Sequence, residues 1–354
     1  MSKIRPDILA VLEKFNAEVA KVTRDHVLKK SYLLPKAMAL NKKVEKLNDR
    51  VYREQINDLD VLRNMLTLKE LQFMANTSRE MNELQFDWLQ KIHPYLPGTK
   101  FEKLMIGSIP AEWQIPENAR ESKMVLFFHS GGFCTGSINT ERMASAEIGE
   151  RFGLKVLSID YRRAPEHPFP AALDDCFTTY CWLLDQGINA KDIMLAGGSA
   201  GGSLVLSTIT KMKQENVPYP AGAYCVSPCT DHSLHDTRMF QNGETDLVLG
   251  NGFVFGLLLA YVRDNDARDP LISPFWGDLT GFPPLLLQVS TSEILYFDNM
   301  NFADKARAAG IPITFHAYPD MPHGLGLSIV KLNPGLPEID EAFSELDTFI
   351  HSIF

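Results

Sequence analysis

Two hydrophobic patterns divide the chain near residue 100. Residues 7–23 and 58–92 place apolar side chains three or four positions apart, which is the spacing of one face of an amphipathic helix. Residues 30–55 are basic and only weakly periodic, and a Pro-rich break follows at 93–98. We therefore expect residues 1–100 to form an N-terminal helical region without strands.

Beyond the break, short apolar runs alternate with helical patterns. The helical patterns lie at about 140–152, 171–186, 200–214, 299–309 and 338–352. The apolar runs occupy 125–128, 156–159, 193–196, 223–226, 285–289 and 313–317. This alternation predicts an α/β fold for residues 101–354, with a mostly parallel central sheet and helices on both faces. The stretch from 227 to 284 is too long for a simple crossover, so we expect an insertion at about 230–265 above the sheet.

Composition narrows the class of protein. The 354 residues are 45% hydrophobic and 22% charged, which is typical of a globular protein rather than a disordered or collagen-like one. The net charge of −9 argues against nucleic acid as the main partner. Residues 1–100 hold 18 Lys and Arg against 13 Asp and Glu, whereas the remainder holds 17 against 31. We interpret this as a basic layer on an acidic body; a basic arm on an anionic membrane is the alternative.

The cysteines and the apolar stretches bear on the compartment. Five cysteines at irregular spacing predict free thiols in a reducing environment. The first residues contain no apolar run of signal-peptide length, and the most apolar stretch, 253–262, is too short to span a bilayer. We therefore expect a cytoplasmic protein without an integral membrane segment.

A glycine-rich turn carries the clearest candidate nucleophile, Ser199. Residues 197–201 read Gly-Gly-Ser-Ala-Gly, a G-x-S-x-G motif between an apolar run and a helical pattern. This is the context of a nucleophile elbow, where a serine lies on a sharp strand-to-helix turn. An ordinary glycine-rich turn is the alternative. A phosphate-binding loop is disfavoured because no Gly-Lys-Ser/Thr follows.

A second glycine-rich segment, residues 129–133, follows the run at 125–128 and reads His-Ser-Gly-Gly-Phe. The backbone N–H groups of Gly131 and Gly132, together with that of Ala200, would bind the oxyanion of a tetrahedral intermediate. We interpret His129 as bracing this loop rather than acting as a base, because the base of such a fold comes after the acid in the sequence.

The candidate base is His323, in a loop after the run at 313–317. A neutral imidazole near a serine can remove its proton and later protonate the leaving group. His232 and His235 would suggest a metal site, but their loop offers no other ligand at a clear spacing, so we expect no bound metal.

Two carboxyl groups after the run at 285–289 are candidates for the residue that orients the base. Glu293 lies in the loop after that run, whereas Asp298 is placed to cap the next helix. We favour Glu293. The order serine, acid, histidine is that of the α/β-hydrolases.

Taken together, these segments resemble the hormone-sensitive-lipase-like carboxylesterases of the α/β-hydrolase fold, over roughly residues 100–350. The family's HGGG segment corresponds to residues 129–132, and its GDSAGG segment to residues 197–202. The most specific match is residues 160–172, which read Asp-Tyr-Arg-Arg-Ala-Pro-Glu-His-Pro-Phe-Pro-Ala-Ala. The sequence departs from the family at Ser130, Gly198 and Cys229, where the family has glycine, aspartate and an aromatic residue. We expect Gly198 to alter loop rigidity or rate without removing activity.

The resemblance implies a serine carboxylesterase that hydrolyses short- to medium-chain esters through an acyl-enzyme intermediate, without a metal or organic cofactor. It also implies a helical cap formed by residues 1–100 and about 230–265, a small-molecule ester as partner, and a homodimer. Asp160 and Glu166 would brace loops. The alternatives are an amidase or deacetylase with the same triad, a lipid-associated lipase that touches a membrane peripherally, and a non-catalytic ligand receptor on the same fold.

Overall fold

The computed structural model describes residues 5–92, 98–120, 122–250, 252–324 and 335–354. Within these residues a single eight-stranded sheet has the order β1-β2-β4-β3-β5-β6-β7-β8. β1 and β2 are antiparallel to each other, β2 is antiparallel to β4, and all other neighbours are parallel. The strands are β1 (Lys100–Ile106), β2 (Ile109–Ile115), β3 (Met124–Phe128), β4 (Lys155–Ile159), β5 (Ile193–Gly198), β6 (Gly222–Val226), β7 (Leu285–Ser290) and β8 (Ile313–Tyr318).

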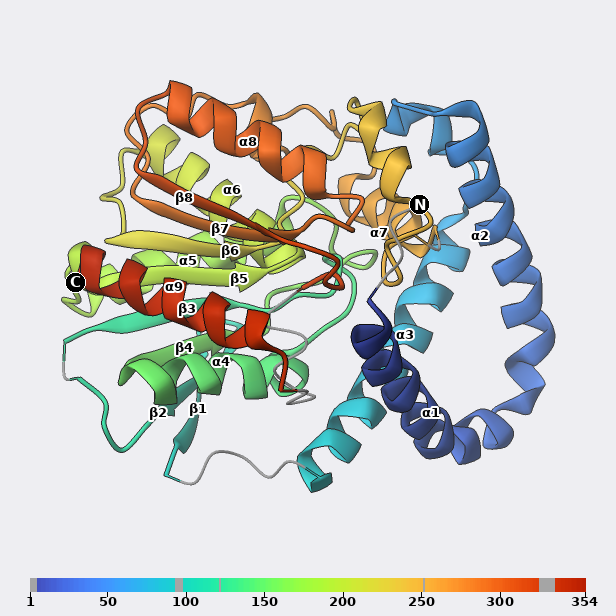
Figure 1. The fold of residues 1–354 in the computed structure, drawn as a ribbon, viewed down its shortest axis with the longest axis horizontal. Helices are drawn as coiled ribbons and strands as arrows, with labels where there is room; N and C mark the ends of the chain where they lie inside the picture. The colour runs from blue at the N-terminus through green and yellow to red at the C-terminus, as the bar shows by residue number, and fades with distance from the viewer. Residues whose placement is uncertain (1–4, 93–97, 121, 251, 325–334) are drawn as a thin grey trace.

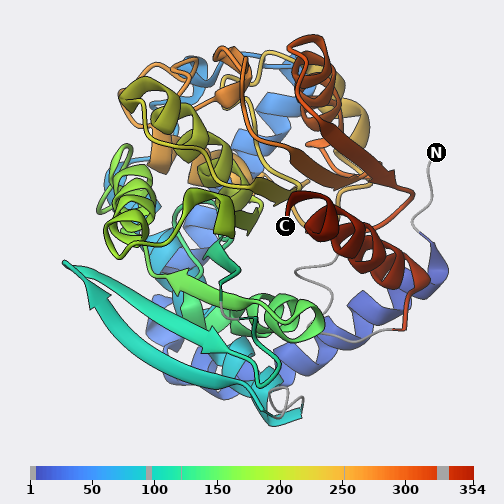
Figure 2. The ribbon, with the colours of Figure 1, turned by 90° about the vertical axis from the view of Figure 1, so that its left-hand side faces the viewer.

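Helices cover both faces of the sheet, which confirms the predicted α/β fold with a mostly parallel sheet (Figures 1 and 2). Their bounds are α1 (Pro6–Lys29), α2 (Leu34–Glu54), α3 (Leu68–Ile92), α4 (Ile138–Phe152), α5 (Ala171–Asp185), α6 (Ala200–Glu215), α7 (Phe253–Val262), α8 (Tyr296–Ala308) and α9 (Pro337–Ile353). The helical patterns in the sequence correspond to α1, α3, α4, α5, α6, α8 and α9. α2 lies in the region expected to be helical, although its pattern is weak, and α7 lies in the expected insertion. The sequence patterns did not predict the β1–β2 hairpin.

The two faces of the sheet bury separate apolar clusters. Leu126 and Phe128 of β3 pack in the cluster that includes α5, α6 and α8, whereas Val125 and Phe127 pack in the cluster that includes α4 and α9. Successive side chains of a strand point to opposite faces. A strand covered on both sides must therefore be apolar at every position, which is why β3 reads as a continuous apolar run.

The first three helices lie beyond one end of the sheet, beside α7 (Figure 1). α2 and α3 both pack against α7, and α1 packs against α3. The buried positions of α2 are spaced three or four apart and are Leu40, Val44, Leu47 and Val51. The lysines between them weaken the hydrophobic pattern. No helix among the described residues combines the length and apolarity that crossing a membrane requires.

Candidate active site

Ser199 lies on a strained turn between β5 and α6. Its φ of 51° and ψ of −124° fall where a residue with a side chain is rarely found. Its N–H donates to Val226 O at 2.7 Å. A Cβ added at Gly201 would lie 2.1 Å from Phe128 O, so only glycine lets the helix pass the strands this closely. The structure therefore contains the sharp strand-to-helix turn that the G-x-S-x-G motif predicts.

His323 and Glu293 form a buried pair. His323 Nδ1 lies 2.5 Å from Glu293 Oε2. The other carboxylate oxygen, Oε1, accepts hydrogen bonds from Ser227 Oγ at 2.7 Å and from Ser290 N at 2.8 Å. Because the carboxylate accepts from Nδ1–H, the ring presents Nε2 as its basic atom. Among the described residues, no hydrogen bond joins Ser199 Oγ to His323.

The charges around His323 favour its protonated form. Burial of the ring lowers its pKa, but the Glu293 carboxylate and the charge of Asp246 outweigh this effect, and the pKa of His323 lies above its ordinary value. An imidazole that gains a proton readily, and that a carboxylate stabilises once it is charged, suits a general base.

Asp298, the other candidate acid, has different partners. Its two oxygens lie 2.6 Å from Thr230 N and 2.5 Å from Thr230 Oγ1. Burial, with the nearby charge of Asp231, raises the pKa of Asp298 to about 8. Of the two carboxyl groups that the sequence offers, the structure brings Glu293 to His323 and leaves Asp298 against Thr230.

Gly131 and Gly132 both adopt backbone conformations that favour glycine, with φ of 116° and 58°. A Cβ at Gly131 would lie 2.4 Å from Thr135 O, and one at Gly132 would lie 2.4 Å from Leu257 Cδ1. Among hydrogen bonds between described residues, none uses the N–H of Gly131, Gly132 or Ala200. Within the described part of the chain, these three donors are therefore left available for a ligand.

Arg79 of α3 holds the loop that carries Gly131 and Gly132. It donates from Nε to Cys134 O at 2.7 Å and from Nη2 to Ala164 O at 2.8 Å. It also forms a salt bridge with Glu166 at 2.8 Å. The sequence analysis missed Arg79, because one arginine within an amphipathic helix carries no local signal of a contact 55 residues away.

The residues expected to brace loops all make such contacts. Asp160 Oδ1 accepts a hydrogen bond from Ile138 N at 2.7 Å, at the start of α4. His129 is fully buried and stacks on Tyr161 at 3.9 Å between ring centroids. Burial lowers the pKa of His129 to about 3, so the ring stays neutral. Ser130, one of the departures from the family, donates its hydroxyl to Glu141 at 2.8 Å.

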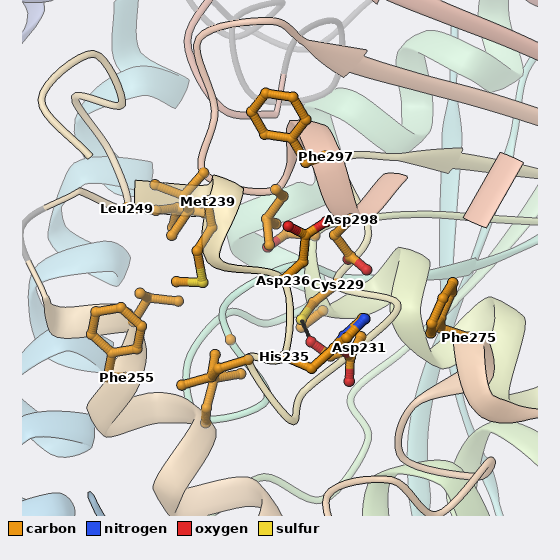
Figure 3. Close-up of a pocket in the computed structure, with 18 of the residues that line it drawn as sticks. Cys229, Asp231, His235, Asp236, Met239, Leu249, Phe255, Phe275, Phe297 and Asp298 are labelled. Atoms are coloured by element: carbon orange, nitrogen blue, oxygen red, sulfur yellow. Dashed lines mark hydrogen bonds and ion pairs between the residues drawn. The ribbon is translucent and has the colours of Figure 1, made fainter. Parts of the chain in front are cut away.

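A pocket opens beside Ser199 (Figure 3). Its empty volume is about 770 Å³, which includes open solvent at the mouth. Met239, Leu249 and Phe255 lie on one side in the figure, and Asp231, His235 and Phe275 on the other. Gly132, Ala200, Cys229 and Asp298 also line the pocket, whereas Gly131 and His323 are not among the described residues that line it. The wall is therefore apolar on one side and more polar on the other.

The two histidines considered for a metal site have separate partners. His235 Nδ1 pairs with Asp231, and His232 Nδ1 lies 3.3 Å from Ser273 Oγ. Within the described part of the chain, no group of three or more His, Cys, Asp and Glu side chains is arranged to hold a metal ion.

Comparison with known proteins identifies the family. Residues 125–327 match a family described as having the alpha/beta hydrolase fold. An acetyl-hydrolase of Streptomyces hygroscopicus is 32% identical over 266 residues, which cover 75% of this chain and 88% of that protein. An esterase of Acinetobacter venetianus is 31% identical over 268 residues, which cover 75% and 87%.

A solved structure extends the similarity to the fold. The crystal structure of an esterase from the bacterial hormone-sensitive lipase family superposes with a TM-score of 0.73 at 29% identity, covering 88% of this chain and 98% of that one. The chain therefore belongs to the α/β-hydrolases and, within them, to the hormone-sensitive-lipase-like carboxylesterases. It is a carboxylic-ester hydrolase.

Proposed function

We propose that the protein is a serine esterase in which Ser199 is the nucleophile, His323 the general base and Glu293 the acid that orients His323. The observation that carries the proposal is the strained turn at Ser199, which presents the serine to the pocket. The buried pair of His323 and Glu293 supports the other two roles. The proposal requires His323 Nε2 to reach Ser199 Oγ, a contact that in many enzymes forms only when substrate is bound.

Acyl transfer then proceeds in two steps. His323 takes the proton of Ser199 as the hydroxyl oxygen attacks the ester carbonyl, and the N–H groups of Gly131, Gly132 and Ala200 hold the oxyanion. The alcohol leaves with the proton from His323. Water, deprotonated by the same ring, attacks the acyl-enzyme and releases the acid. The Glu293 carboxylate stays ionised throughout and stabilises the protonated ring.

The substrates that we propose are short- to medium-chain esters. Met239, Leu249 and Phe255 supply an apolar wall suited to an acyl chain, and α7, which contributes Phe255, packs on α2 and α3. We propose that residues 1–100 and about 230–265 together form a cap that limits chain length.

A cytoplasmic location and a homodimer remain proposals. All five cysteines are unpaired, which suits a reducing compartment. The homodimer rests on the family resemblance alone, and sedimentation equilibrium of the purified chain would test it.

Peripheral contact with a membrane is a second proposal, carried by the turn between α1 and α2. Leu28 near the end of α1, Tyr32 in the turn and Met38 near the start of α2 are 59%, 74% and 69% exposed. Lys29 and Lys42 beside them are also exposed. Exposed apolar side chains among lysines are the composition of segments that rest on anionic lipid surfaces.

Hydrolysis of p-nitrophenyl esters with acyl chains of about two to sixteen carbons tests the esterase proposal. We expect wild type to cleave the short esters, and Ser199→Ala to lose at least about a thousandfold in kcat/KM. The matching p-nitroanilides separate an esterase from an amidase. Equal activity of the two proteins on every ester would refute the role of Ser199.

A further inference from the structure

The chain segment before α7 is hydrogen-bonded to the loop that carries Glu293. Asn242 Nδ2 donates to Thr291 O at 2.8 Å and to Glu293 O at 2.7 Å. Thr245 Oγ1 lies 3.0 Å from Ser292 O and 3.1 Å from Asn242 O, so its single proton is shared between these two carbonyls. Two side chains thus hold three consecutive carbonyls of a loop that lies outside the sheet and its helices.

Asp246 completes these contacts from the other end of the same segment. Its Oδ2 accepts a hydrogen bond from Ile294 N at 3.0 Å, directly after Glu293. Its Oδ1 accepts from Val248 N at 3.0 Å and from Leu249 N at 2.8 Å, which fixes the carboxylate within its own turn. Asp246 is only 6% exposed, so these bonds are shielded from competing water.

α2 supports the segment from behind. The Tyr52 ring lies edge-on to Phe240, with centroids 5.4 Å apart. A Cβ at Gly243 would lie 2.0 Å from Tyr52 Cε1, so the backbone of the segment rests directly on this ring. Asn48 Nδ2 also reaches Gly250 O at 3.4 Å. The N-terminal helices are thereby linked through the segment to the loop of Glu293.

We propose that Asn242, Thr245 and Asp246, which we call the acid-loop clamp, position Glu293 against His323 and so set the turnover rate. The inference rests on the proposed role of Glu293 as the acid of the triad. Asn242, Thr245 and Asp246 are positioning residues, because they act on the reaction through Glu293. Through the clamp, the N-terminal helices would support the position of Glu293 in addition to covering the pocket.

The clamp affects the turnover rate through the orientation of the His323 ring. Glu293 must hold the His323 ring within a narrow range of orientations for Nε2 to reach the serine. A misplacement of about 1 Å in a catalytic constellation can cost about a hundredfold in rate. Asn242, Thr245 and Asp246 are not among the described residues that line the pocket, so we expect their loss to lower kcat and leave KM nearly unchanged.

Matched variants at Thr245 give the sharpest test. Thr245→Val keeps the shape and removes the hydroxyl donor, whereas Thr245→Ser keeps the donor. Asn242→Ala removes both amide donors, and Glu244→Gln alters an exposed residue of the same segment as a control. We expect kcat on p-nitrophenyl butyrate to fall about tenfold in Thr245→Val and about 10- to 100-fold in Asn242→Ala, with KM within about twofold of wild type. Thr245→Ser and Glu244→Gln stay near wild type.

Asp246→Asn has a distinct signature. An amide nitrogen in place of Oδ2 cannot accept the Ile294 N–H bond, and the variant also removes a negative charge that acts on His323. Among the described residues, the charges that act on His323 are those of Glu293 and Asp246. We expect kcat to fall and the acidic midpoint of the kcat/KM profile to move to lower pH, since the protonated ring loses one stabilising charge.

An observation independent of activity separates this proposal from the esterase mechanism. In wild type, the proton between His323 Nδ1 and Glu293 should give a strongly downfield NMR resonance, and Asn242→Ala should weaken or shift it. If Ser199→Ala stays active, the esterase mechanism fails while this resonance still reports on the clamp. The clamp is refuted if the resonance is unchanged in Asn242→Ala, if kcat of Asn242→Ala and Thr245→Val stays within about twofold of wild type, or if Thr245→Ser falls as far as Thr245→Val.

Discussion

At the scale of single residues, the structure distinguishes Glu293 from Asp298, the two carboxyl groups that the sequence offered as candidates for the acid that orients His323. Glu293 accepts hydrogen bonds from the His323 ring, from Ser227 and from a backbone N–H. Asp298 is partly buried near Asp231, and desolvation with the charge of Asp231 raises the pKa of its carboxyl to about 8. A group that stays protonated near neutral pH cannot stabilise a charged imidazolium, which argues against Asp298 as the acid.

Substituting the two carboxyl groups tests this assignment. We expect Glu293→Gln to lose about 10³- to 10⁴-fold in kcat, since the amide no longer stabilises the charged ring. Asp298→Asn replaces a neutral carboxyl with a neutral amide of the same shape, so we expect a loss below about tenfold. Steady-state kinetics at pH 7, below the pKa of about 8 of Asp298, measures both. A larger loss in Asp298→Asn than in Glu293→Gln would reverse the assignment.

The pH profile of the wild type follows from the same pair. His323 acts as a base only when neutral, and its pKa lies above the ordinary value of about 6.5. Activity therefore falls as the pH decreases through that raised pKa, so kcat/KM should have an acidic midpoint above about 6.5. The residual activity of Glu293→Gln should have a lower midpoint, because the main stabilising charge is gone. An unchanged midpoint would mean that another group controls the acidic limb.

At the scale of elements, the strands that are buried on both faces could be predicted from the sequence, whereas the exposed strand β1 could not. The inner strands are continuous apolar runs, so their positions follow directly from the pattern. β1 is largely exposed and places Lys100, Glu102 and Lys103 among its apolar residues, which hides the strand. The contacts of Arg79 and of the acid-loop clamp join segments about 50 or more residues apart. No local pattern encodes such pairings, so the nucleophile turn was predictable, whereas the contacts that hold the loops of Gly131 and Glu293 were not.

The packing of α2 offers a stability test that separates a ring from its hydroxyl. Within the described residues, the buried Tyr52 hydroxyl has no hydrogen-bond partner, while its ring packs against Phe240. An unpaired buried hydroxyl costs about 1 kcal/mol or more, so Tyr52→Phe should be neutral or stabilising. Tyr52→Ala should destabilise the fold by about 3 kcal/mol. It should also lower kcat, because the segment that carries the clamp loses the aromatic ring on which its backbone rests. Denaturant unfolding measures both, and a marked loss of stability in Tyr52→Phe would show that the hydroxyl has a partner.

At the scale of the whole molecule, charge and exposed apolar surface gather at the N-terminal helices. Residues 1–100 carry more Lys and Arg than Asp and Glu, while the chain as a whole has a net charge of −9. Such a distribution directs the basic helices, rather than the acidic body, toward an anionic surface. Val254, Phe255 and Leu258 of α7 line the pocket, and α2 and α3 pack against α7.

Co-sedimentation with lipid vesicles tests the membrane proposal. We expect the full chain to sediment with vesicles rich in anionic lipid and to remain free with zwitterionic vesicles, with binding weakening as salt is added. Leu28→Ser combined with Met38→Ser should reduce sedimentation, and Glu244→Gln should not. Failure to bind anionic vesicles at low salt would remove the proposal and leave the ester hydrolysis untouched.

The central claim, that Ser199 forms the covalent acyl intermediate, is tested most directly by trapping the adduct. The protein would be treated with a p-nitrophenyl phosphonate, which transfers its phosphonyl group to an activated serine, and analysed by mass spectrometry before and after proteolysis. The account predicts one adduct per chain, on the peptide that contains Ser199, absent from Ser199→Ala and formed far more slowly in His323→Ala. An adduct on another residue, or an equal adduct in Ser199→Ala, would contradict it.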